Sequence, residues 1–279
     1  MNEILEKREI AENILLIKIH NPQIAKKAQP GNFVILRTHE DGERFPLTIG
    51  DSDVEDGTIT MFFMIVGRST HHLSTLDVGD TILNVMGPLG NHFDVKNYGT
   101  VVVVGGGIGI AVAYPEAKAL SKAGNRVISI IGARNKDLLL MEDELRELSD
   151  ELYITTDDGS KGHKGFVTQV LQKLIDDGEK IDLVTTIGPP IMMKVVSNVT
   201  RPYGIKTIVN LNPIMLDGTG MCGGCRVSVG GQTLFACVDG PSFDGHEVDF
   251  DLLMSRLGHY REKESESVEE HQCNLSLQR

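Results

Sequence analysis

The 279-residue sequence contains no tryptophan, and aromatic residues make up only 5% of it. So few rings leave little stacking surface for sugars or for single-stranded nucleic acid. Basic residues are also scarce, since 27 lysines and arginines stand against 39 aspartates and glutamates and the net charge is −12. Nucleic acids bind to basic surfaces, so this charge argues against a nucleic-acid partner.

Long apolar runs are absent as well. No segment approaches the roughly 20 consecutive apolar residues that cross a bilayer, and residues 1–20 alternate charged and aliphatic side chains, unlike a signal peptide. Cysteine occurs only four times, and three of the four lie in one short stretch, which excludes a disulfide scaffold. We therefore predict a cytoplasmic protein with no membrane contact, long enough for two domains and a small appendage.

That short stretch is DGTGMCGGCRVSVGGQTLFAC, residues 217–237. Plant-type [2Fe–2S] clusters are held by thiolates spaced C-x4-C-x2-C, with a fourth cysteine further on. Counting back from Cys222 by this spacing reaches Asp217 instead of a cysteine. Four glycines among residues 218–224 supply the sharp turns, often at positive φ, that a loop around a cluster needs. We interpret the stretch as a [2Fe–2S] site whose ligands are Asp217, Cys222, Cys225 and Cys237.

Two other kinds of site fit parts of the same stretch. A structural zinc ion could take the same four side chains, although zinc sites usually pair C-x2-C with a second close pair. A redox-active C-x-x-C needs a strand before it and a helix after it, whereas RVSVGGQTLFACV alternates like a hairpin. Asp217 also has a second interpretation, because an aspartate in a glycine-rich segment is commonly a turn residue.

Residues 1–98 predict an antiparallel β-barrel. Short alternating segments such as ILLIKIH, FVILRT and GTITMFFMIV are separated by turn residues, which is typical of small barrels. Residues 44–48, R-F-P-L-T, combine an arginine, a proline without an N–H and a hydroxyl. Residues 66–70, V-G-R-S-T, place a glycine and two hydroxyls at a strand end, which suits a phosphate. A bent edge strand and an ordinary turn are the alternative interpretations of these two segments.

Residues 99–212 predict a doubly wound parallel sheet. VVVVGGGIGIAVAYPEAKAL contains a buried strand, a glycine-rich turn and a helix, an arrangement that binds a nucleotide pyrophosphate at the helix N-terminus. Strand and helix patterns then alternate as far as DLVTTIGPP. Ligands of such sheets bind at the carboxyl ends of the strands, where residues 105–109, 157–159 and 188–190 fall. Because G-x-G-x-x-G is incomplete, a tight structural turn is the alternative for the glycines.

The last two parts of the chain are smaller. Residues 213–250 hold the cysteine stretch and predict a small cluster domain. Residues 251–279 begin as a helix and continue as an acidic tail of low complexity, for which a solvated or disordered state is expected. Cys273 lies in this tail, far from the other three cysteines, so we do not expect it to bind the cluster.

The order of these parts resembles the ferredoxin–NADP reductase superfamily: R-F-P-L-T and V-G-R-S-T in a barrel, G-G-G-I-G and G-P-P in a nucleotide domain, then a cysteine loop. Within that superfamily the sequence is similar to the electron-transfer subunits of class B dihydroorotate dehydrogenases, which carry a C-terminal [2Fe–2S] domain with four cysteines. The aspartate at position 217 makes it more similar to the small subunits of NADH-dependent reduced ferredoxin:NADP oxidoreductases, also called sulfide dehydrogenases. The resemblance covers nearly the whole chain.

The resemblance implies FAD between the barrel and the nucleotide domain, and NAD(H) on the sheet. Arg44 would lie near the flavin pyrophosphate, and Ser69 and Thr70 would cap phosphate. Asp157 and Asp158 stand where NADP-dependent members carry serine and arginine. Two carboxylates repel a 2′-phosphate and accept ribose hydroxyls, so NAD(H) is favoured. The other implied contacts are Phe45, Pro46, Leu47, Thr48, Met64, Ile65, Val66 and Gly67 for FAD, and Gly106, Gly107, Ile108, Gly109, Gly188 and Pro189 for the dinucleotide.

The implied function is that of an oxidoreductase subunit that passes electrons between NAD(H), FAD and the [2Fe–2S] cluster, with no catalytic side chain. Its partner would be a larger subunit containing flavin and iron–sulfur clusters, in a heterodimer that bifurcates electrons and reaches ferredoxin. Two other functions stay open. One is the electron-transfer subunit of a class B dihydroorotate dehydrogenase, and the other is a non-catalytic scaffold that binds a metal or a nucleotide.

Overall fold

The structure is a computed structural model that describes residues 1–260, 262–264 and 266–267. Cys273 and most of the expected acidic tail lie outside the described residues. In the described part of the chain no helix is long and apolar enough to cross a membrane.

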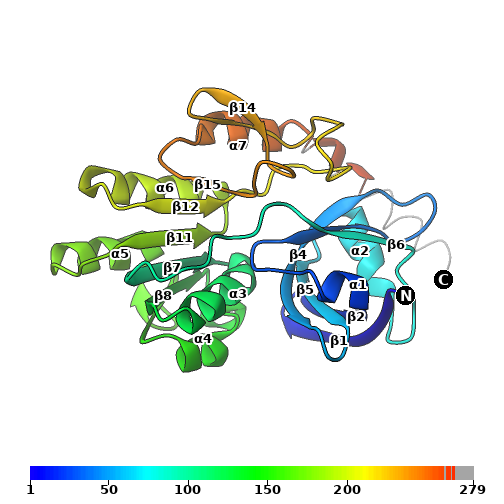
Figure 1. Cartoon of the computed structure of the whole chain (residues 1–279), viewed down its shortest axis with the longest axis horizontal. Coiled ribbons are helices and arrows are strands. Elements are labelled where there is room, and N and C mark those ends of the chain that lie inside the picture. Colours follow the sequence, from blue (N-terminus) through cyan, green and yellow to red (C-terminus); the bar gives the residue numbers. More distant parts are fainter. Residues whose placement is uncertain (261, 265, 268–279) are drawn as a thin grey trace.

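The N-terminal part is a six-stranded antiparallel sheet with the order β1-β2-β5-β4-β3-β6, curled into a barrel (Figure 1). Its edges meet where Glu3 bridges Thr81 and where the Ile4 N–H donates to the carbonyl of Asp80 at 2.8 Å. The predicted antiparallel barrel is therefore confirmed. Its strands are β1 (Glu3–Ala11), β2 (Ile14–His20), β3 (Phe33–Arg37), β4 (Phe45–Asp53), β5 (Thr58–Met64) and β6 (Asn84–Leu89), and its helices are α1 (Pro22–Ala25) and α2 (Arg68–Thr75).

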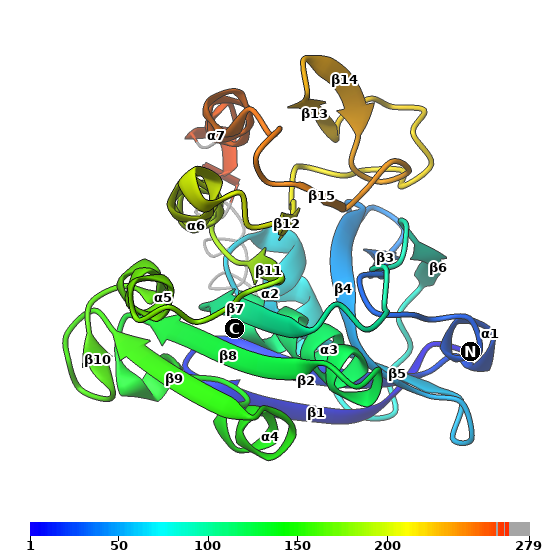
Figure 2. The same cartoon turned by 60° about the vertical axis from the view of Figure 1, so that its left-hand side comes forward.

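The second part is a seven-stranded sheet with the order β10-β9-β8-β7-β11-β12-β15, which Figure 2 shows with its helices. All of its pairs are parallel except β12 with β15. The predicted doubly wound sheet is confirmed. Its strands are β7 (Thr100–Gly106), β8 (Arg126–Ala133), β9 (Glu151–Thr156), β10 (His163–Lys164), β11 (Leu183–Ile187), β12 (Thr207–Asn210) and β15 (Ser242–Asp244). Its helices are α3 (Gly109–Lys122), η1 (Lys136–Leu138), α4 (Glu142–Leu148), α5 (Val167–Asp176), α6 (Pro190–Thr200) and η2 (Arg201–Tyr203).

The four-valine run of β7 shows why this sheet is buried on both faces. Side chains alternate across a strand, so Val101 and Val103 pack in the core that contains α3 and α4, while Val102 and Val104 pack in the core that contains α5 and α6. All four are at most 2% exposed. An uninterrupted apolar strand is therefore the expected pattern for a central parallel strand.

The C-terminal part lies on top of both other parts (Figure 1). The chain leaves the sheet after β12, forms the cysteine loop and a two-stranded hairpin, and returns as β15 to pair with β12. One apolar cluster joins Phe33 of the barrel, Val209 of β12 and Val227 of the hairpin. The hairpin and the final helix are β13 (Arg226–Val229), β14 (Gln232–Phe235) and α7 (Phe250–Gly258).

The structure differs from the sequence-based predictions in three local features. Residues 66–70 are not a simple turn, because Gly67 is the N-cap of α2. The helical pattern between β8 and β9, KDLLLMEDELRELS, forms two short helices, η1 and α4, in place of one, with Met141 at a left-handed φ of 54° between them. The proline in R-F-P-L-T does not interrupt the sheet, since Pro46 lies within β4 opposite Ile35.

Candidate functional site

The glycine-rich turn lies at the point where the strand order of the parallel sheet reverses. β8 lies on one side of β7 and β11 on the other, and Ile187 at the end of β11 pairs with Gly105. α3 starts at Gly109 directly after this turn, so the positive end of its dipole faces the carboxyl edge of the sheet. At its start the Ile110 and Ala111 N–H groups donate to the carbonyls of Gly107 and Ile108, both at 3.1 Å. A helix N-terminus at a topological switch point is where such sheets bind nucleotide phosphates.

Backbone contacts explain why the turn requires glycine. A Cβ at Gly109 would collide with the carbonyl oxygen of Ile187 and would lie 2.8 Å from the Cα of Gly188. A Cβ at Gly188 would in turn meet Met192 at 2.6 Å and the carbonyl oxygen of Gly106 at 3.2 Å. The predicted residues 106–109 and the G-P turn thus lie against each other, and the Met192 side chain packs beside both Gly106 and Gly188.

Asp157 and Asp158 lie beside the end of β8, although their carboxylates differ. Their N–H groups donate to the carbonyls of Ala133 and Arg134 at 3.1 and 3.2 Å. The Asp158 carboxylate accepts the Ser160 N–H at 2.9 Å, and hydrogen bonds from the Ser160 hydroxyl and N–H lower the pKa of Asp158. The Asp158 carboxylate therefore stabilises its own turn.

The barrel segments named from the sequence lie at neighbouring strand ends. Residues 45–48 of β4 are half-buried, whereas the next two residues of this strand are fully buried. Thr70 of α2 accepts the N–H groups of Val66 and Gly67, both at 3.1 Å, so its hydroxyl caps the helix. Ser69 donates to Glu43 at 3.2 Å. Of the two predicted phosphate-capping hydroxyls, one is thus engaged in the local fold and the other faces a carboxylate.

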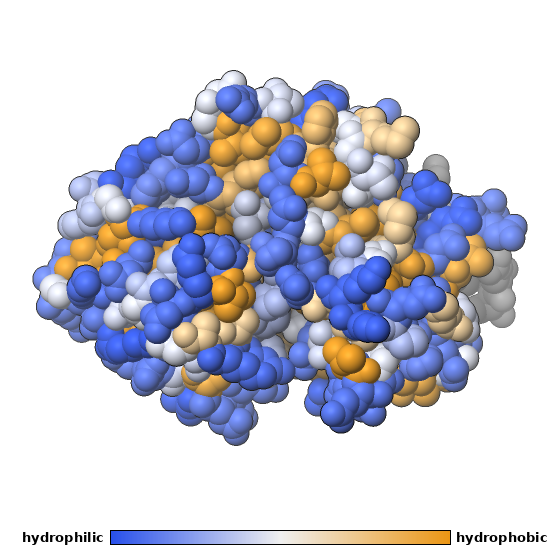
Figure 3. Space-filling model, in the orientation of Figure 1, coloured by the Kyte–Doolittle hydropathy of each residue, from blue (hydrophilic) through white to orange (hydrophobic). Residues whose placement is uncertain are grey.

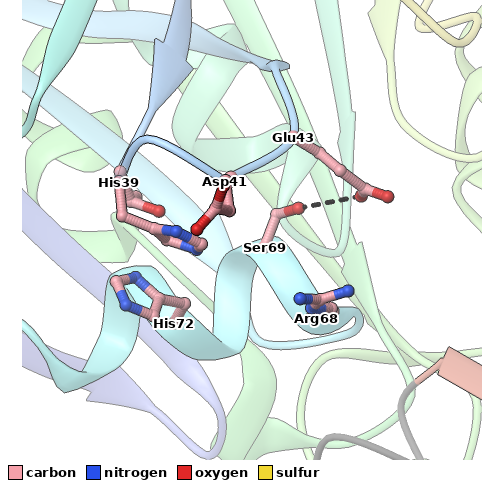
Figure 4. Close-up of a pocket in the computed structure, with 8 residues that line it drawn as sticks. His39, Asp41, Glu43, Arg68, Ser69 and His72 are labelled. Atoms are coloured by element: carbon pink, nitrogen blue, oxygen red, sulfur yellow. Dashed lines mark hydrogen bonds between the residues drawn. The ribbon is translucent and has the colours of Figure 1, made fainter.

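A hollow of about 150 Å³ lies between the β3–β4 loop and α2 (Figure 4). The rings of His39 and His72 approach to 4.4 Å between centroids on one side, and Ser69 and Glu43 are hydrogen-bonded on the other. Arg68 also lines this hollow. Arg68 was not among the residues predicted to bind a cofactor. It could have been predicted, because it belongs to the V-G-R-S-T motif and would place a cation beside the expected phosphates.

A second, larger cleft of about 490 Å³ separates the barrel from α3 and α4, at the notch on the lower side of Figure 3. Lys118 of α3 bridges to Asp51 of β4 at 3.2 Å across this boundary. None of the residues predicted for a cofactor lines this cleft. The predicted flavin and nucleotide contacts therefore lie elsewhere along the domain boundary.

The cysteine loop places its four predicted ligands as two pairs. Cys225 and Cys237 are buried, and their sulfurs lie 3.2 Å apart. Cys222 is exposed, and Asp217 accepts its N–H at 2.7 Å. Burial, followed by the neighbouring Cys225, raises the pKa of Cys237 to about 12. In the metal-free chain this burial favours the protonated form of the thiol.

The four predicted ligands lie as Asp217 with Cys222 and as Cys225 with Cys237, an arrangement that offers two donors to each of two irons. Gly218, Gly220 and Gly223 have φ values of 72°, 81° and 65°, so the loop turns where only glycine is comfortable. Backbone N–H groups from Thr219 and Cys222 lower the pKa of Asp217 and keep it ionised. The donor set and the loop conformation fit a [2Fe–2S] group.

One buried carboxyl group was not predicted from the sequence. Glu116, on the second turn of α3, is completely buried and accepts hydrogen bonds from the Thr185 hydroxyl at 2.8 Å and the Asn210 amide at 2.7 Å. Burial raises the pKa of Glu116 to about 7, against the lowering effect of these two donors. A glutamate inside an amphipathic helix usually faces solvent, so the sequence offered no signal for this contact.

Comparison with known proteins identifies the family. Residues 103–198 match the oxidoreductase NAD-binding domain, and residues 212–249 match the iron–sulfur cluster binding domain of dihydroorotate dehydrogenase B. A homolog of the dihydroorotate dehydrogenase B (NAD(+)) electron transfer subunit from Thermotoga maritima is 53% identical, covering 96% of this chain and 95% of the relative. The chain belongs to the dihydroorotate dehydrogenase B electron-transfer subunit family. A probable electron transfer subunit of this family from Methanopyrus kandleri is 34% identical over 88% of the chain and 90% of the relative.

Two solved structures extend the comparison. A chain from the structure of an NADH-dependent reduced ferredoxin-NADP oxidoreductase, which concerns flavin-based electron bifurcation, is 52% identical with a TM-score of 0.92 and covers 97% of each chain. A ferredoxin NADP+ reductase from Neisseria gonorrhoeae with bound FAD and NADP is 16% identical with a TM-score of 0.58, over 72% of this chain and 90% of that one. The second match shows the shared fold alone.

These findings confirm the predicted resemblance, fold and class of oxidoreductase, and they support FAD, [2Fe–2S] and NAD(H) as the cofactor set. The iron–sulfur domain overrides the zinc and redox-active C-x-x-C alternatives. Members of this electron-transfer subunit family are named as subunits, so a partner chain is implied. The roles of individual residues stay predictions.

Replacing Gly109 with alanine tests the contact between the two turns. Because the new Cβ would push against Ile187 and Gly188, we expect the KM for NADH to rise about tenfold, equivalent to roughly 1.4 kcal/mol, while FAD content is unchanged. Steady-state dye reduction with NADH measures this. Gly258→Ala is the control, because a Cβ at that position of α7 meets no atom within 4 Å; an equal effect of both variants would contradict the model of the turn.

Replacing Glu116 with glutamine tests the buried carboxyl group through stability. Between pH 4.5 and 7 the folded chain retains a proton on Glu116 that the unfolded chain has released. The free energy of unfolding therefore falls as pH rises through this window, by on the order of 3 kcal/mol. Urea unfolding at several pH values should show this fall in the wild type and in the exposed control Glu55→Gln, and a shallower one in Glu116→Gln. Equal slopes in all three proteins would contradict it.

Proposed function

We propose that this chain is the NAD(H)- and FAD-binding subunit of an electron-bifurcating NADH-dependent ferredoxin:NADP oxidoreductase. The observation that carries the proposal is the cysteine loop with Asp217 as its first donor, in a chain 52% identical over 97% of its length to a chain of such an enzyme. When bound, the cofactors supply hydride exchange and one-electron transfer. The protein side chains bind and orient them.

The nucleotide part of the site would hold NAD(H) along the carboxyl edge of the sheet. The positive end of α3 faces the pyrophosphate, and the turn leaves room for its approach at Gly107, where no atom lies within 4 Å of an added Cβ. Gly188 and Pro189 cover the nicotinamide end. The Asp157 carboxylate accepts the ribose hydroxyls and repels a 2′-phosphate, so it selects NAD(H) over NADP.

The flavin part would lie between β4 and the start of α2. Phe45, Pro46, Leu47 and Thr48 line the ring system, together with Met64, Ile65, Val66 and Gly67. Arg44 and Ser69 lie toward the phosphates, and Thr70 positions this corner by capping α2. Arg68, in the hollow of Figure 4, adds a second cation near the phosphates.

The cluster would be held by Asp217 and Cys222 on its solvent side and by Cys225 and Cys237 on its buried side. Apolar residues next to these ligands in the chain are exposed: Met221 is 88% exposed, Leu216 48% and Val238 41%. Figure 3 shows apolar residues gathered on this upper part of the molecule. Exposed apolar groups around a ligand loop suit the surface of a partner chain, here the larger subunit through which electrons reach ferredoxin.

The alternative is the electron-transfer subunit of a class B dihydroorotate dehydrogenase, which most named relatives favour. The first donor distinguishes the two, because four cysteines are expected in that branch and this chain has Asp217. Co-purification with a dihydroorotate-oxidising partner would favour the alternative.

Anaerobic visible and EPR spectra of the purified chain, before and after addition of NADH, test the proposal. We expect flavin absorption that bleaches with NADH and a rhombic signal of a reduced [2Fe–2S] cluster. A colourless protein that contains one zinc ion would contradict the proposal and favour a metal-binding scaffold.

Replacing Asp217 with cysteine tests the fourth ligand. A thiolate donates more electron density than a carboxylate, so the reduction potential of the cluster should fall. A fall of about 59 mV corresponds to a tenfold shift of the equilibrium between the reduced and the oxidised cluster toward the oxidised form. EPR-monitored redox titration measures it. Asp239→Asn is the control, since Asp239 accepts the Phe235 N–H at 2.7 Å in the same unit without being a predicted ligand. An unchanged potential in Asp217→Cys would remove Asp217 from the ligand set.

A further inference from the structure

Glu116 joins three segments that lead to three different parts of the site. Its own helix, α3, begins at the glycine turn that faces the nucleotide. Thr185, which donates to one carboxylate oxygen, lies on β11 two residues before this strand ends at Ile187, and the G-P turn follows. Asn210, which donates to the other oxygen, is the last residue of β12, where the chain departs toward the cluster loop.

The segment from Asn210 to the cluster loop is held at both of its ends. At the start, Asn210 pairs with Ser242 of β15 and the Leu211 N–H donates to the carbonyl of Pro241 at 2.9 Å. At the far end, Gly218 packs on the barrel so closely that a Cβ there would lie 2.6 Å from Leu89 and 3.0 Å from Ile35. The position of Asp217 therefore depends on the nucleotide domain at one end and on the barrel at the other.

A buried carboxyl group stabilises the contact between these segments less than apolar side chains would. Moving it from water is unfavourable even with two hydrogen bonds, and apolar residues of similar volume commonly give equal or greater stability. The two hydrogen bonds, by contrast, fix the positions of their donors, because one carboxylate oxygen accepts from Thr185 of β11 at 2.8 Å and the other from Asn210 of β12 at 2.7 Å. The arrangement therefore favours a fixed position of Asn210 over maximal stability.

We propose that Glu116 is a positioning residue for electron transfer to the cluster: by holding Asn210 it fixes the point from which the cluster segment leaves the nucleotide-binding sheet. This inference rests on the proposed function, because it assumes that electrons pass from a flavin at the domain boundary to the cluster. Glu116 touches neither cofactor in this scheme. It acts through Asn210 on the distance and orientation between them.

The test uses the full chain, purified anaerobically with its flavin and cluster, and follows both by stopped flow after mixing with NADH. In Glu116→Ala and Asn210→Ala the flavin should bleach within twofold of the wild-type rate, while cluster reduction slows by about tenfold. The EPR spectrum of the reduced cluster should change in both variants. Because they remove the same contact, the double variant should be no slower than either single variant.

Glu116→Gln and Thr185→Val are the matched variants. A glutamine can accept the Asn210 amide with its oxygen and donate to the Thr185 hydroxyl with its nitrogen, so cluster reduction should return to within twofold of wild type. Thr185→Val removes the contact with β11 but keeps Asn210, and it should behave like wild type. If Glu116→Ala does not fold, Asn210→Ala and Glu116→Gln still decide between a positioning role and none.

Two results would overturn the inference. One is cluster reduction at the wild-type rate in Asn210→Ala or Glu116→Ala, and the other is an equal slowing of flavin and cluster reduction in these variants, which indicates a general structural defect. Failure of the proposed function gives a different result, because the wild-type flavin would then not bleach with NADH at all.

Discussion

The antiparallel pairing of β12 with β15 fixes the relation between the cluster loop and the rest of the molecule. Residues 208–210 pair with residues 242–244, and everything between them is an excursion from one edge of the nucleotide-binding sheet. Because the two ends of the excursion are hydrogen-bonded neighbours, the cysteine loop has no freedom to move away from the sheet as a whole. The His246 ring, which lies 2.9 Å from the Thr200 hydroxyl of α6, adds a further contact just after β15. The cluster loop is thus a part of the nucleotide domain as much as a domain of its own.

The same sheet brings the other functional segments together. The reversal of strand order between β8-β7 and β11 places the glycine turn beside the G-P turn, and the absence of side chains at both allows backbone to approach backbone. The barrel is attached to this edge by an apolar interface in which Ile14 and Leu16 of β2 pack in one cluster with Ile110 of α3. The segments predicted to bind flavin, nucleotide and cluster therefore converge through ordinary sheet geometry and packing.

The sequence predicted those features that depend on local pattern. Four consecutive valines, a glycine-rich turn and alternating strands and helices were sufficient to predict the parallel sheet, and cysteine spacing was sufficient to predict the iron–sulfur loop. It could not predict features that depend on contacts between distant residues. The return of residues 242–244 to the sheet, the burial of Glu116 between Thr185 and Asn210, and the packing of Gly218 on the barrel all join segments far apart in the chain. The start of α2 was missed for a different reason, because a glycine N-cap resembles an ordinary turn.

The unequal burial of the two donor pairs has a consequence for the assembly of the protein. Cys225 and Cys237 are at most 2% exposed, whereas Cys222 is exposed and Asp217 is half-buried. With the four ligands proposed above, iron and sulfide, or a preformed cluster from a carrier protein, would arrive from the side of Cys222 and would reach the inner thiols before the loop closes. A partner chain over the apolar residues around Met221, as proposed above, would shut this entrance. Maturation of the cluster would then have to precede assembly of the complex, and repair of a damaged cluster would require the subunits to separate.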